Sequence, residues 1–579
     1  MGLGKTLQTA AFLWHLYCDR GKAGPFLVVA PLSTVAHWQR EIEGWTGMNT
    51  VVYHGSQEDR SVIEEYELYF DGGNGSGSGG SRRRRGAGGY KPVVIVTTPD
   101  MVARPDVQRV LGPIEYEVLV VDEAHRLKND ASVITQTLAK RTGRYDWKRC
   151  LLLTGTPLQN STEELWTLLN FVDPDKFAEK SEFAERFGDM SNQSQVEQLV
   201  KVMKAYVLRR MKEDVEKGVP PKQETLVEVE LTGVQKQYYR ALYEQNTQFL
   251  LRGGKRKVAD RPSLMNLAME LRNALIVWGR EGPSLMNLAM ELRKCCNHPY
   301  LIKGAELTIK ENSLLDTGAS ELDQMVACSG KLVLLDKLLP RLREQGHRVL
   351  IFSQFKIMLD IIEDFLIGRR YSYGRIDGNI TGPNRQRQID AFQAEGSTMF
   401  VMMLSTKAGG VGITLTAADT VIIFDSDWNP QNDLQAQARC HRIGQTKSVK
   451  VYRLLTRKTY EQVMFQAASK KLGLDQAVLS QGRASRAEDG LAKVSVAEVE
   501  GLLRRGAYDA FKEGEDGMEA SRKFCESDID VILQRSQASS TLNFSKASFV
   551  ADGEGGEPVD LDDPDFWTKV STALHVAKP

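Results

Sequence analysis

The chain has 579 residues, of which 42% are hydrophobic and 26% charged, the composition of a globular protein with several domains. Its 75 basic and 75 acidic side chains balance, so the overall charge argues neither for nor against a nucleic-acid partner. No apolar run approaches the ~20 residues of a membrane span, and the seven cysteines form no CxxC pair, as expected for reduced intracellular thiols.

The sequence opens on MGLGKT, which matches the end of a phosphate-binding loop. Gly2 and Gly4 would let the backbone N–H groups cradle phosphates at a helix N-terminus. Lys5 would reach the β- and γ-phosphates of ATP, and the Thr6 hydroxyl would ligate Mg²⁺. Gly4 matches the second glycine of the pattern G-x-x-x-x-G-K-[ST], so we expect the start of the loop and its supporting strand to be missing. The alternative for this motif alone is a chance GKT in a surface turn.

Short apolar runs then alternate with helical patterns in two series. The first series comprises residues 26–31, 93–98, 116–125 and 149–157, and the second comprises residues 348–354, 400–406, 420–427 and 449–455. Because this alternation is typical of parallel sheets with crossover helices, it predicts an α/β fold with two lobes. We expect the first lobe over 1–222 and the second over 223–470, with a helical insertion at about 235–300.

Two stretches interrupt these series. Residues 71–90 are rich in glycine and serine and predict a flexible insertion, whose four arginines suit either a solvated loop or a weak DNA-binding or import segment. The peptide PSLMNLAMELR occurs at 262–272 and again at 283–293. We expect only the second copy to pack in place, because a duplicated exon or an assembly error explains the first.

The pattern weakens after residue 470. Amphipathic helical stretches continue, and the tail from residue 551 is acidic and glycine-rich. We therefore expect residues 471–579 to form a partly disordered, helical regulatory or linker extension.

An acidic pair follows the buried run at 116–121. Asp122 and Glu123 would stand at the carboxyl end of a strand, where open α/β sheets bind ligands. Asp122 would hold Mg²⁺, and Glu123 would orient and polarise the attacking water. His125 could relay the state of the phosphate. A structural strand-end pair is the alternative, although adjacent acids repel each other without a cation between them.

In the second lobe the stretch 427–445 reads DWNPQNDLQAQARCHRIGQ. We expect Asn432 to cap a helix, with Asp433 in its first turn. The spacing i, i+4, i+7 then predicts that the side chains of three residues share one helical face; these are Gln435, Arg439 and Arg442. Two guanidiniums on one face would clamp a triphosphate and stabilise charge during phosphoryl transfer, whereas the alternative is a solvated basic helix.

Because the phosphate loop and the arginines lie in different lobes, we expect ATP to bind between the lobes. ATP would draw the two lobes together and hydrolysis would release them, so the lobes could step along a polymer. Hydroxyl-bearing strand ends occur in both lobes and suit sequence-neutral contacts with phosphates. In contrast, Cys295, Cys296 and His298 lie close together but offer no second ligand pair, so we predict core packing there rather than a metal site.

In order and spacing the motifs GLGKT, DEAH, LTGTPLQN, STKAGGVGITL and QAQARCHRIGQ resemble those of superfamily-two helicases, and more closely Swi/Snf-type DNA translocases. DEAHRLKN, RRMKEDVEKGVPPK and SGKLVLLDKLL look like the chromodomain-helicase-DNA-binding (CHD) remodelers. LLRRGAYDAF, KFCESDIDVIL, FSKASFVA and LDDPDFW are similar to the Kismet-like branch of that family. This resemblance covers the chain apart from the insertion at 71–90 and the first repeat copy.

The resemblance implies two RecA-like lobes that hydrolyse Mg-ATP. It assigns Lys5 and Thr6 to the first motif and Asp122, Glu123 and His125 to the second. It assigns the later motifs to Thr154, Gly155 and Thr156, to Ser405, Thr406 and Gly410, and to Gln435, Arg439 and Arg442. The implied DNA-tracking positions are Ser33, Thr34, Thr97, Ser353, Ser405, Thr406 and Trp428.

The implied function is movement on double-stranded DNA without strand separation and sliding of nucleosomes in the nucleus, with histones and a larger remodeling complex as partners. We expect the family's chromodomains, adenine-contacting segment and downstream DNA-binding module to be absent from this chain. Two alternatives stay open. One is a translocase for DNA repair or for stripping proteins from DNA, and the other is an inactive, truncated chromatin-binding fragment.

Overall fold

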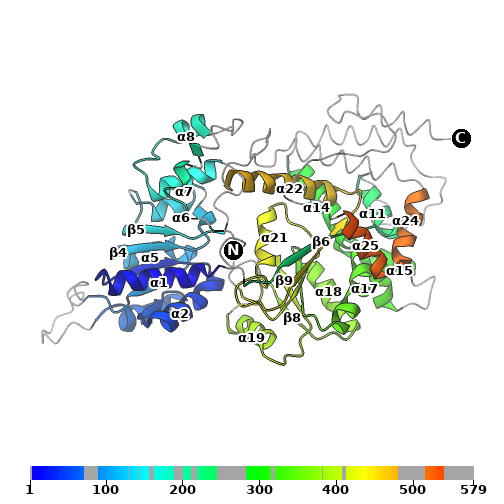
Figure 1. Cartoon of the computed structure of the whole chain (residues 1–579), viewed down its shortest axis with the longest axis horizontal. Coiled ribbons are helices and arrows are strands. Elements are labelled where there is room, and N and C mark those ends of the chain that lie inside the picture. The colour runs from blue at the N-terminus through cyan, green and yellow to red at the C-terminus, as the bar shows by residue number, and fades with distance from the viewer. Residues whose placement is uncertain are drawn as a thin grey trace. The chain divides into compact units, whose positions relative to one another are not determined.

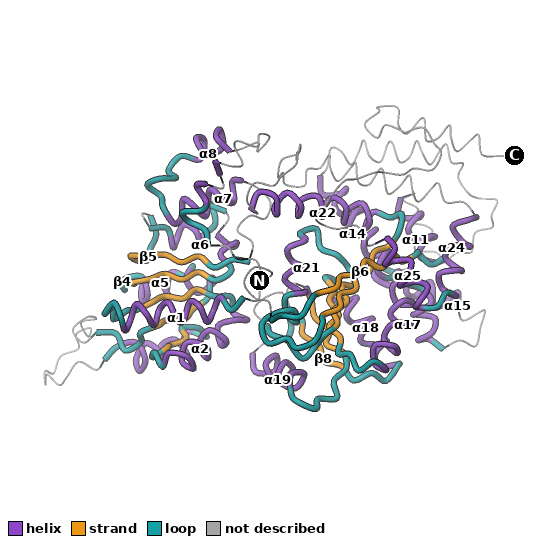
Figure 2. Tube along the Cα trace, in the orientation of Figure 1, coloured by secondary structure: helices purple, strands orange, loops and turns teal. Residues whose placement is uncertain are grey.

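The computed structural model divides into two compact units, residues 1–218 with 411–414 and 474–491, and residues 219–410 with 415–473 and 492–579. Within them it describes residues 3–70, 89–127, 129–140, 142–155, 162–187, 198–199, 201–208, 210, 218–243, 282–313, 320–380, 382–406, 413–479 and 515–539. Each unit contains one parallel sheet with helices packed on it (Figures 1 and 2). The predicted fold of two parallel α/β lobes is therefore confirmed.

The first sheet has five strands in the order β2-β3-β1-β4-β5. They are β2 (Thr50–Val52), β3 (Val94–Thr97), β1 (Phe26–Val29), β4 (Glu115–Val121) and β5 (Asp146–Leu152). β1, in the middle, is buried along its whole length, as expected for a short run of apolar residues covered on both faces. β5 closes the order, so among the described strands it pairs on one side only, with β4.

The helices of the first unit lie on both faces of this sheet. They are α1 (Lys5–Cys18), α2 (Leu32–Thr46), α3 (Gln57–Ile63), the π-helix η1 (Glu64–Leu68), α4 (Pro99–Val102), α5 (Pro105–Leu111), the 3-10 turn η2 (Ala124–Leu127), α6 (Val133–Leu138), α7 (Thr162–Val172) and α8 (Lys180–Phe187). Alternate strand residues face opposite ways. Val28 and Val120 therefore pack on α1 and α2, whereas Leu27 and Leu119 pack on the side of α4 to α7.

The second sheet has six strands in the order β6-β11-β10-β7-β9-β8. They are β6 (Lys222–Val229), β11 (Val449–Thr456), β10 (Thr420–Ile423), β7 (Val349–Ser353), β9 (Val401–Ser405) and β8 (Tyr373–Ile376). The surrounding helices are α11 (Gly233–Tyr243), α14 (Gly282–Asn297), η4 (Pro299–Leu301), α15 (Ala305–Ser313), α16 (Glu321–Ala327), α17 (Gly330–Glu344), α18 (Lys356–Gly368), α19 (Gly382–Gln393), α21 (Pro430–Gln437), α22 (Tyr460–Leu479), α24 (Glu515–Glu526) and α25 (Ile529–Ser539).

The second copy of the repeated peptide lies in α14. Its Leu288, Ala289 and Leu292 are buried in a cluster formed with α11 and α15. The first copy, 262–272, lies outside the described residues, as does most of the insertion at 71–90. Packing of the second copy is therefore confirmed, and the expectation for the first copy stays a prediction.

The helices α24 and α25 pack against the second sheet, although they come from the extension expected to be regulatory or linker. Phe524, Ile529 and Ile532 are buried in the same core cluster as β6, β7 and α17. Lys337 of α17 donates to the Cys525 carbonyl, and Ser521 donates to the Leu231 carbonyl. This part of the extension thus belongs to the core of the second unit.

Candidate functional site

The phosphate-loop fragment ends in a helix whose N-terminus is set by a glycine. Gly4 has a φ of 71°, in the left-handed region that favours glycine, and α1 begins at Lys5. No side chain of the described residues caps this 14-residue helix, so its first N–H groups and the positive end of its dipole are open to an anion. Gly2 lies outside the described residues. The local geometry around Gly4, Lys5 and Thr6 suits a phosphate.

Asp122 lies directly after β4 and is buried, with 9% of its surface exposed. The indole N–H of Trp38 on α2 donates to its Oδ2 at 3.0 Å, and the Glu123 N–H donates to its Oδ1 at 2.9 Å. Burial and the neighbouring Glu123 raise the pKa of Asp122, while Trp38 and the Lys5 ammonium oppose that rise. A buried carboxylate with a raised pKa next to a second acid is a site that a cation would stabilise.

Glu123 adopts a backbone conformation that is uncommon for its residue type. Its φ is 50°, in the left-handed region, which costs a non-glycine residue about 1 kcal/mol or more. This bend ends the strand and is followed by η2. Oε2 of Glu123 lies 3.2 Å from Nδ1 of His125. The three acidic-motif residues predicted to act together, Asp122, Glu123 and His125, therefore do lie together.

The next motif lies beside this pair. β4 and β5 run in register with Val121 opposite Leu152, and the Ala124 N–H donates to the Leu153 carbonyl at 2.8 Å. Thr154 and Gly155 follow on the same sheet edge, whereas Thr156 lies outside the described residues. The carboxyl edge of the first sheet thus holds the described residues of the predicted second and third motifs, and Lys5 of the first motif lies close enough to Asp122 to affect its pKa.

The residues predicted to contact DNA differ in accessibility. In the first unit Ser33 is half-buried, while Thr34 and Thr97 are buried and donate to the carbonyls of Pro31 and Tyr53, respectively. Direct contact between DNA and these last two hydroxyls would require them to leave internal partners. Their DNA-binding role stays a prediction.

In the second unit Ser353 is buried and donates to the carboxylate of Asp425, and Thr406 is also buried. Ser405 and Trp428 are half-buried, and the Trp428 ring lies 5.9 Å from that of Tyr460. Gly410 lies outside the described residues. Of these positions Ser405 and Trp428 offer the more accessible side chains.

The cap of α21 differs from the prediction. Asn429, not Asn432, is the N-cap, and its side chain accepts from the Gln431 N–H at 3.1 Å. Pro430 stands at the first helical position, which its fixed φ suits, so the helix starts earlier than expected. Asp433 does lie in the first turn, as predicted.

The prediction that Gln435, Arg439 and Arg442 share one helical face is wrong. α21 ends at Gln437, and both arginines lie in the turns that follow. The Arg439 N–H donates to the carbonyl of Ala436, three residues back, at 3.1 Å, so the α-helical bonding pattern stops there, and the Arg439 carbonyl accepts from the distant Leu415 N–H at 2.9 Å. Gln435 and Arg439 are buried, with 7% and 8% exposed, and Arg442 is half-buried.

Two supporting residues were not identified from the sequence. Trp38 holds Asp122 from α2, and Gln445 donates from one amide nitrogen to the carbonyls of Thr416, Ala418 and Cys440 at 3.1, 2.8 and 3.2 Å. Gln445 thereby fixes the turn that carries the arginines. A Trp in an amphipathic helix gives no sequence signal for such a role, whereas Gln445 lies inside the HRIGQ motif.

The cysteine-histidine cluster packs in the core, as predicted. Cys295, Cys296 and His298 are all at most 1% exposed. Nε2 of His298 hydrogen-bonds the Met325 carbonyl at 2.9 Å, and its Nδ1 accepts from the Tyr300 N–H. Burial lowers the pKa of His298 to about 4. These contacts use both ring nitrogens of the histidine.

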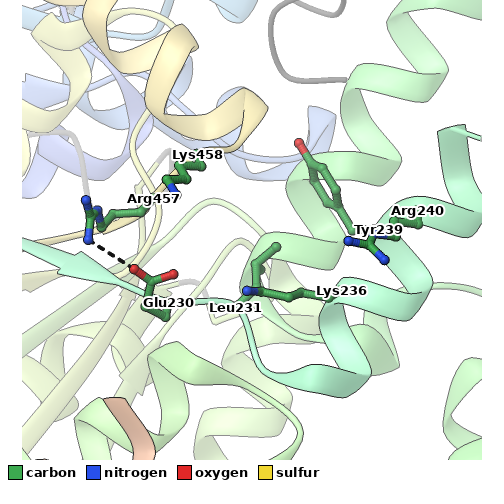
Figure 3. A pocket seen from close by; sticks show the side chains of 7 residues that line it. All are labelled: Glu230, Leu231, Lys236, Tyr239, Arg240, Arg457 and Lys458. Atoms are coloured by element: carbon green, nitrogen blue, oxygen red, sulfur yellow. Dashed lines mark hydrogen bonds and ion pairs between the residues drawn. The ribbon is translucent and has the colours of Figure 1, made fainter. Parts of the chain in front are cut away.

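A small surface pocket lies in the second unit between α11 and the turn after β11 (Figure 3). Its lining residues are Glu230, Leu231, Lys236, Tyr239, Arg240, Arg457 and Lys458. Arg457 contacts Glu230 at 3.2 Å and Glu228 at 3.4 Å, so two carboxylates offset part of the positive charge. None of the predicted ATP-binding residues lines this pocket.

The two sets of site residues belong to different units, so the expectation of one shared nucleotide stays a prediction. No helix among the described residues is both long and apolar enough to cross a membrane.

Comparison with known proteins identifies the family. Residues 1–301 match the SNF2-related domain, and residues 330–444 match the helicase conserved C-terminal domain. The chain is 50% identical to chromodomain-helicase-DNA-binding protein 7 of Gallus gallus over 98% of this chain and 18% of that protein. It is 48% identical to protein 6 of Rattus norvegicus over 98% of this chain and 20% of that protein.

It is also 50% identical to protein 8 of Mus musculus, over 98% of this chain and 21% of that protein. The chain thus spans about a fifth of the length of these relatives. Together with the two parallel sheets and the motif residues at their edges, these matches show that the chain belongs to the SNF2-related family and groups there with the chromodomain-helicase-DNA-binding (CHD) proteins.

Proposed function

We propose that this chain is the ATP-hydrolysing motor of a chromatin remodeler, which moves along double-stranded DNA and slides nucleosomes. The observation that carries the proposal is the carboxyl edge of the first sheet. There the buried Asp122 lies within electrostatic reach of Lys5 at an uncapped helix N-terminus, and the bent Glu123 follows it directly. A cation, an anion-binding helix end and a pair of acids are the parts that phosphoryl transfer needs.

The residues present fit Mg²⁺. Their donors are oxygens, the hydroxyl of Thr6 and the carboxylate of Asp122, which are the ligands this hard cation prefers. When bound, Mg²⁺ would neutralise phosphate charge and stabilise the ionised form of Asp122, whose pKa burial raises.

The chain's own residues then have distinct roles. Lys5 and the first N–H groups of α1 bind the phosphates, and Glu123 orients a water molecule and accepts its proton as the water attacks the γ-phosphate. Arg439 and Arg442 stabilise the charge that develops on the transferred group, as arginine fingers do. Gln435 acts together with these two arginines and helps to position the bound ATP and the attacking water.

Double-stranded DNA and nucleosomes are the proposed partners, supported by the similarity to proteins named as chromodomain-helicase-DNA-binding. The same similarity supports a place in the nucleus and in a larger remodeling complex. Contacts to phosphate rather than to bases suit a motor that must not stop at particular sequences.

The decisive experiment is ATP hydrolysis by the purified chain alone, with double-stranded DNA and with nucleosomes, beside the variant Glu123→Gln. We expect polymer-stimulated hydrolysis that Glu123→Gln lowers on the order of 100-fold or more while ATP binding persists. Nucleosome sliding in a gel-shift assay is the second readout.

Other outcomes point elsewhere. Stimulation by bare DNA without sliding would favour a translocase for DNA repair or protein stripping. Binding to nucleosomes without hydrolysis would favour an inactive fragment. Hydrolysis that Glu123→Gln leaves unchanged would contradict the assignment of the water-activating acid.

A further inference from the structure

A buried arginine of β11 joins three parts of the second unit. Arg453 is 6% exposed, and its side chain donates to Glu224 on β6 at 3.0 Å and to the hydroxyl of Ser426 after β10 at 3.1 Å. It also forms an ion pair with Asp433 in the first turn of α21. Its guanidinium lies over the ring of Phe465, 5.1 Å from the centroid. The planar fork of an arginine can satisfy several acceptors at once in this way.

The far end of α21 is attached to the same group. Gln437, the last residue of the helix, donates to Glu224 at 3.1 Å and accepts from Lys222 at 2.7 Å. Burial raises the pKa of Glu224, but Arg453 and Lys222 outweigh this effect and hold it below its usual value. Asp433 at the start of α21 and Gln437 at its end are thus both fixed to the β6–β11 edge of the sheet.

Such attachment matters because α21 has only 8 residues. A helix this short has little stability of its own and depends on tertiary contacts. Gln435 lies between the two attached residues, and Arg439 follows two positions after the second. The position of α21 in the second unit therefore determines the positions of the Gln435 and Arg439 side chains.

The segment after β10, which leads into α21, is held by contacts that do not involve Arg453. The buried Lys331 donates to the Phe424 carbonyl at 2.8 Å and pairs with Glu461 at 2.6 Å, and Arg293 donates to the Ser426 carbonyl at 2.9 Å. Loss of Arg453 would leave these contacts in place. The predicted consequence is a displaced α21 on an intact sheet.

We propose that Arg453 is a positioning residue for ATP hydrolysis, which holds α21 through Asp433 and Glu224 so that Gln435, Arg439 and Arg442 keep their working arrangement. This inference rests on the proposed function. It adds a residue that is not among the predicted site residues, which acts through other side chains and does not touch the nucleotide.

The test compares Arg453→Met with a matched control, Arg375→Met. Arg375 lies on β8, at the opposite edge of the same sheet, with a side chain that is 12% exposed. Its ion-pair partners are Asp360, Glu363 and Asp377. Both variants remove a largely buried guanidinium from several carboxylates, so their effects on Tm should be similar, whereas only Arg453→Met releases α21.

We expect Arg453→Met to lower kcat roughly 10- to 100-fold, because small displacements of catalytic groups have effects of this size. The ATP dissociation constant should change less than about threefold, since the phosphate loop is untouched. Arg453→Lys keeps the charge but cannot reach all three acceptors, so it should restore Tm more fully than kcat. Lys222→Met, which removes a 28% exposed partner, provides a milder variant if Arg453→Met does not fold.

Hydrogen exchange of the amides of residues 431–437 provides a readout that does not depend on activity. It should rise in Arg453→Met, and in Lys222→Met to a lesser degree, and stay unchanged in Arg375→Met. Equal losses of kcat in the two methionine variants, or unchanged exchange in α21, would overturn the positioning role. A wild-type chain that does not hydrolyse ATP would instead refute the proposed function, while the exchange result would still decide whether Arg453 holds α21.

Discussion

The acidic site of the first unit and the arginine turn of the second are built in opposite ways. Asp122 and Glu123 are placed by the backbone, because a buried strand ends there and the chain bends at a positive φ. Arg439 and Arg442 lie in irregular turns that distant side chains hold, such as that of Gln445, and the contacts of Arg453 fix the helix before them. A site placed by a strand end depends on few residues, whereas a site placed by side chains depends on a network.

This comparison predicts where substitutions act most strongly. In the first unit, the largest effects should come from the charged groups themselves, because the backbone that places them is robust. In the second, residues that never touch the nucleotide should matter as well.

The largest effect is expected for Lys5→Ala. Loss of the ammonium at the helix N-terminus should weaken ATP binding and lower turnover on the order of 100-fold or more. The measurement is steady-state ATP hydrolysis together with binding of a labelled nucleotide. Lys148→Ala is the control, because Lys148 pairs with Glu117 at an exposed position of the same unit. Equal losses in the two variants would remove the distinction between the phosphate loop and general surface charge.

A smaller effect is expected for Trp38→Phe. The indole N–H donates to the carboxylate of Asp122 and favours its ionised form, so its loss should raise the pKa of Asp122 further. Metal binding needs the ionised form, so the acid limb of the pH–rate profile should move to higher pH. At neutral pH the rate should fall by roughly tenfold, since the lower end of what one hydrogen bond to a charged group contributes, about 1.5 kcal/mol, corresponds to a factor of about ten.

Trp45→Phe is the matched control for this pH experiment. Trp45 lies on the same helix, donates to Glu41 at 3.0 Å and is 66% exposed. Its substitution should leave the acid limb where it is. An acid limb at the same pH in Trp38→Phe and in wild type would show that the indole does not tune Asp122.

The smallest effect concerns stability and the start of α21. Asn429→Ala removes the N-cap and should lower the free energy of unfolding by about 1 kcal/mol, measured by urea denaturation. Asn432→Ala, inside the helix, should be close to neutral or slightly stabilising. The reverse ranking would mean that the helix starts where the sequence pattern suggested.

The sequence contained enough to predict the sheets and the acidic site. The run at 118–121 is apolar throughout, and the two acids after it stand at the strand's carboxyl end. In the same way, the second repeat copy was predicted to pack, and Leu292 of α14 is fully buried.

The arginine turn was harder to predict because its shape depends on long-range contacts. Helical spacing alone extended α21 through Arg442, but the Arg439 N–H donates to the Ala436 carbonyl instead of the Gln435 carbonyl, and the helix ends at Gln437. Asn432 and Asn429 are both good capping residues, and Pro430 decides between them. Glu224 lies 229 positions before Arg453, so no local pattern connects the two.

The edge strand β5 has a practical consequence. Among the described strands it is paired on one side only, and Cys150, Leu151 and Leu152 are half-buried apolar residues along it. An unpaired parallel edge with apolar side chains is a template onto which another polypeptide can add a strand. Whether a preparation of this chain stays monodisperse when concentrated will therefore depend on what covers the backbone N–H and C=O groups on the unpaired side of β5.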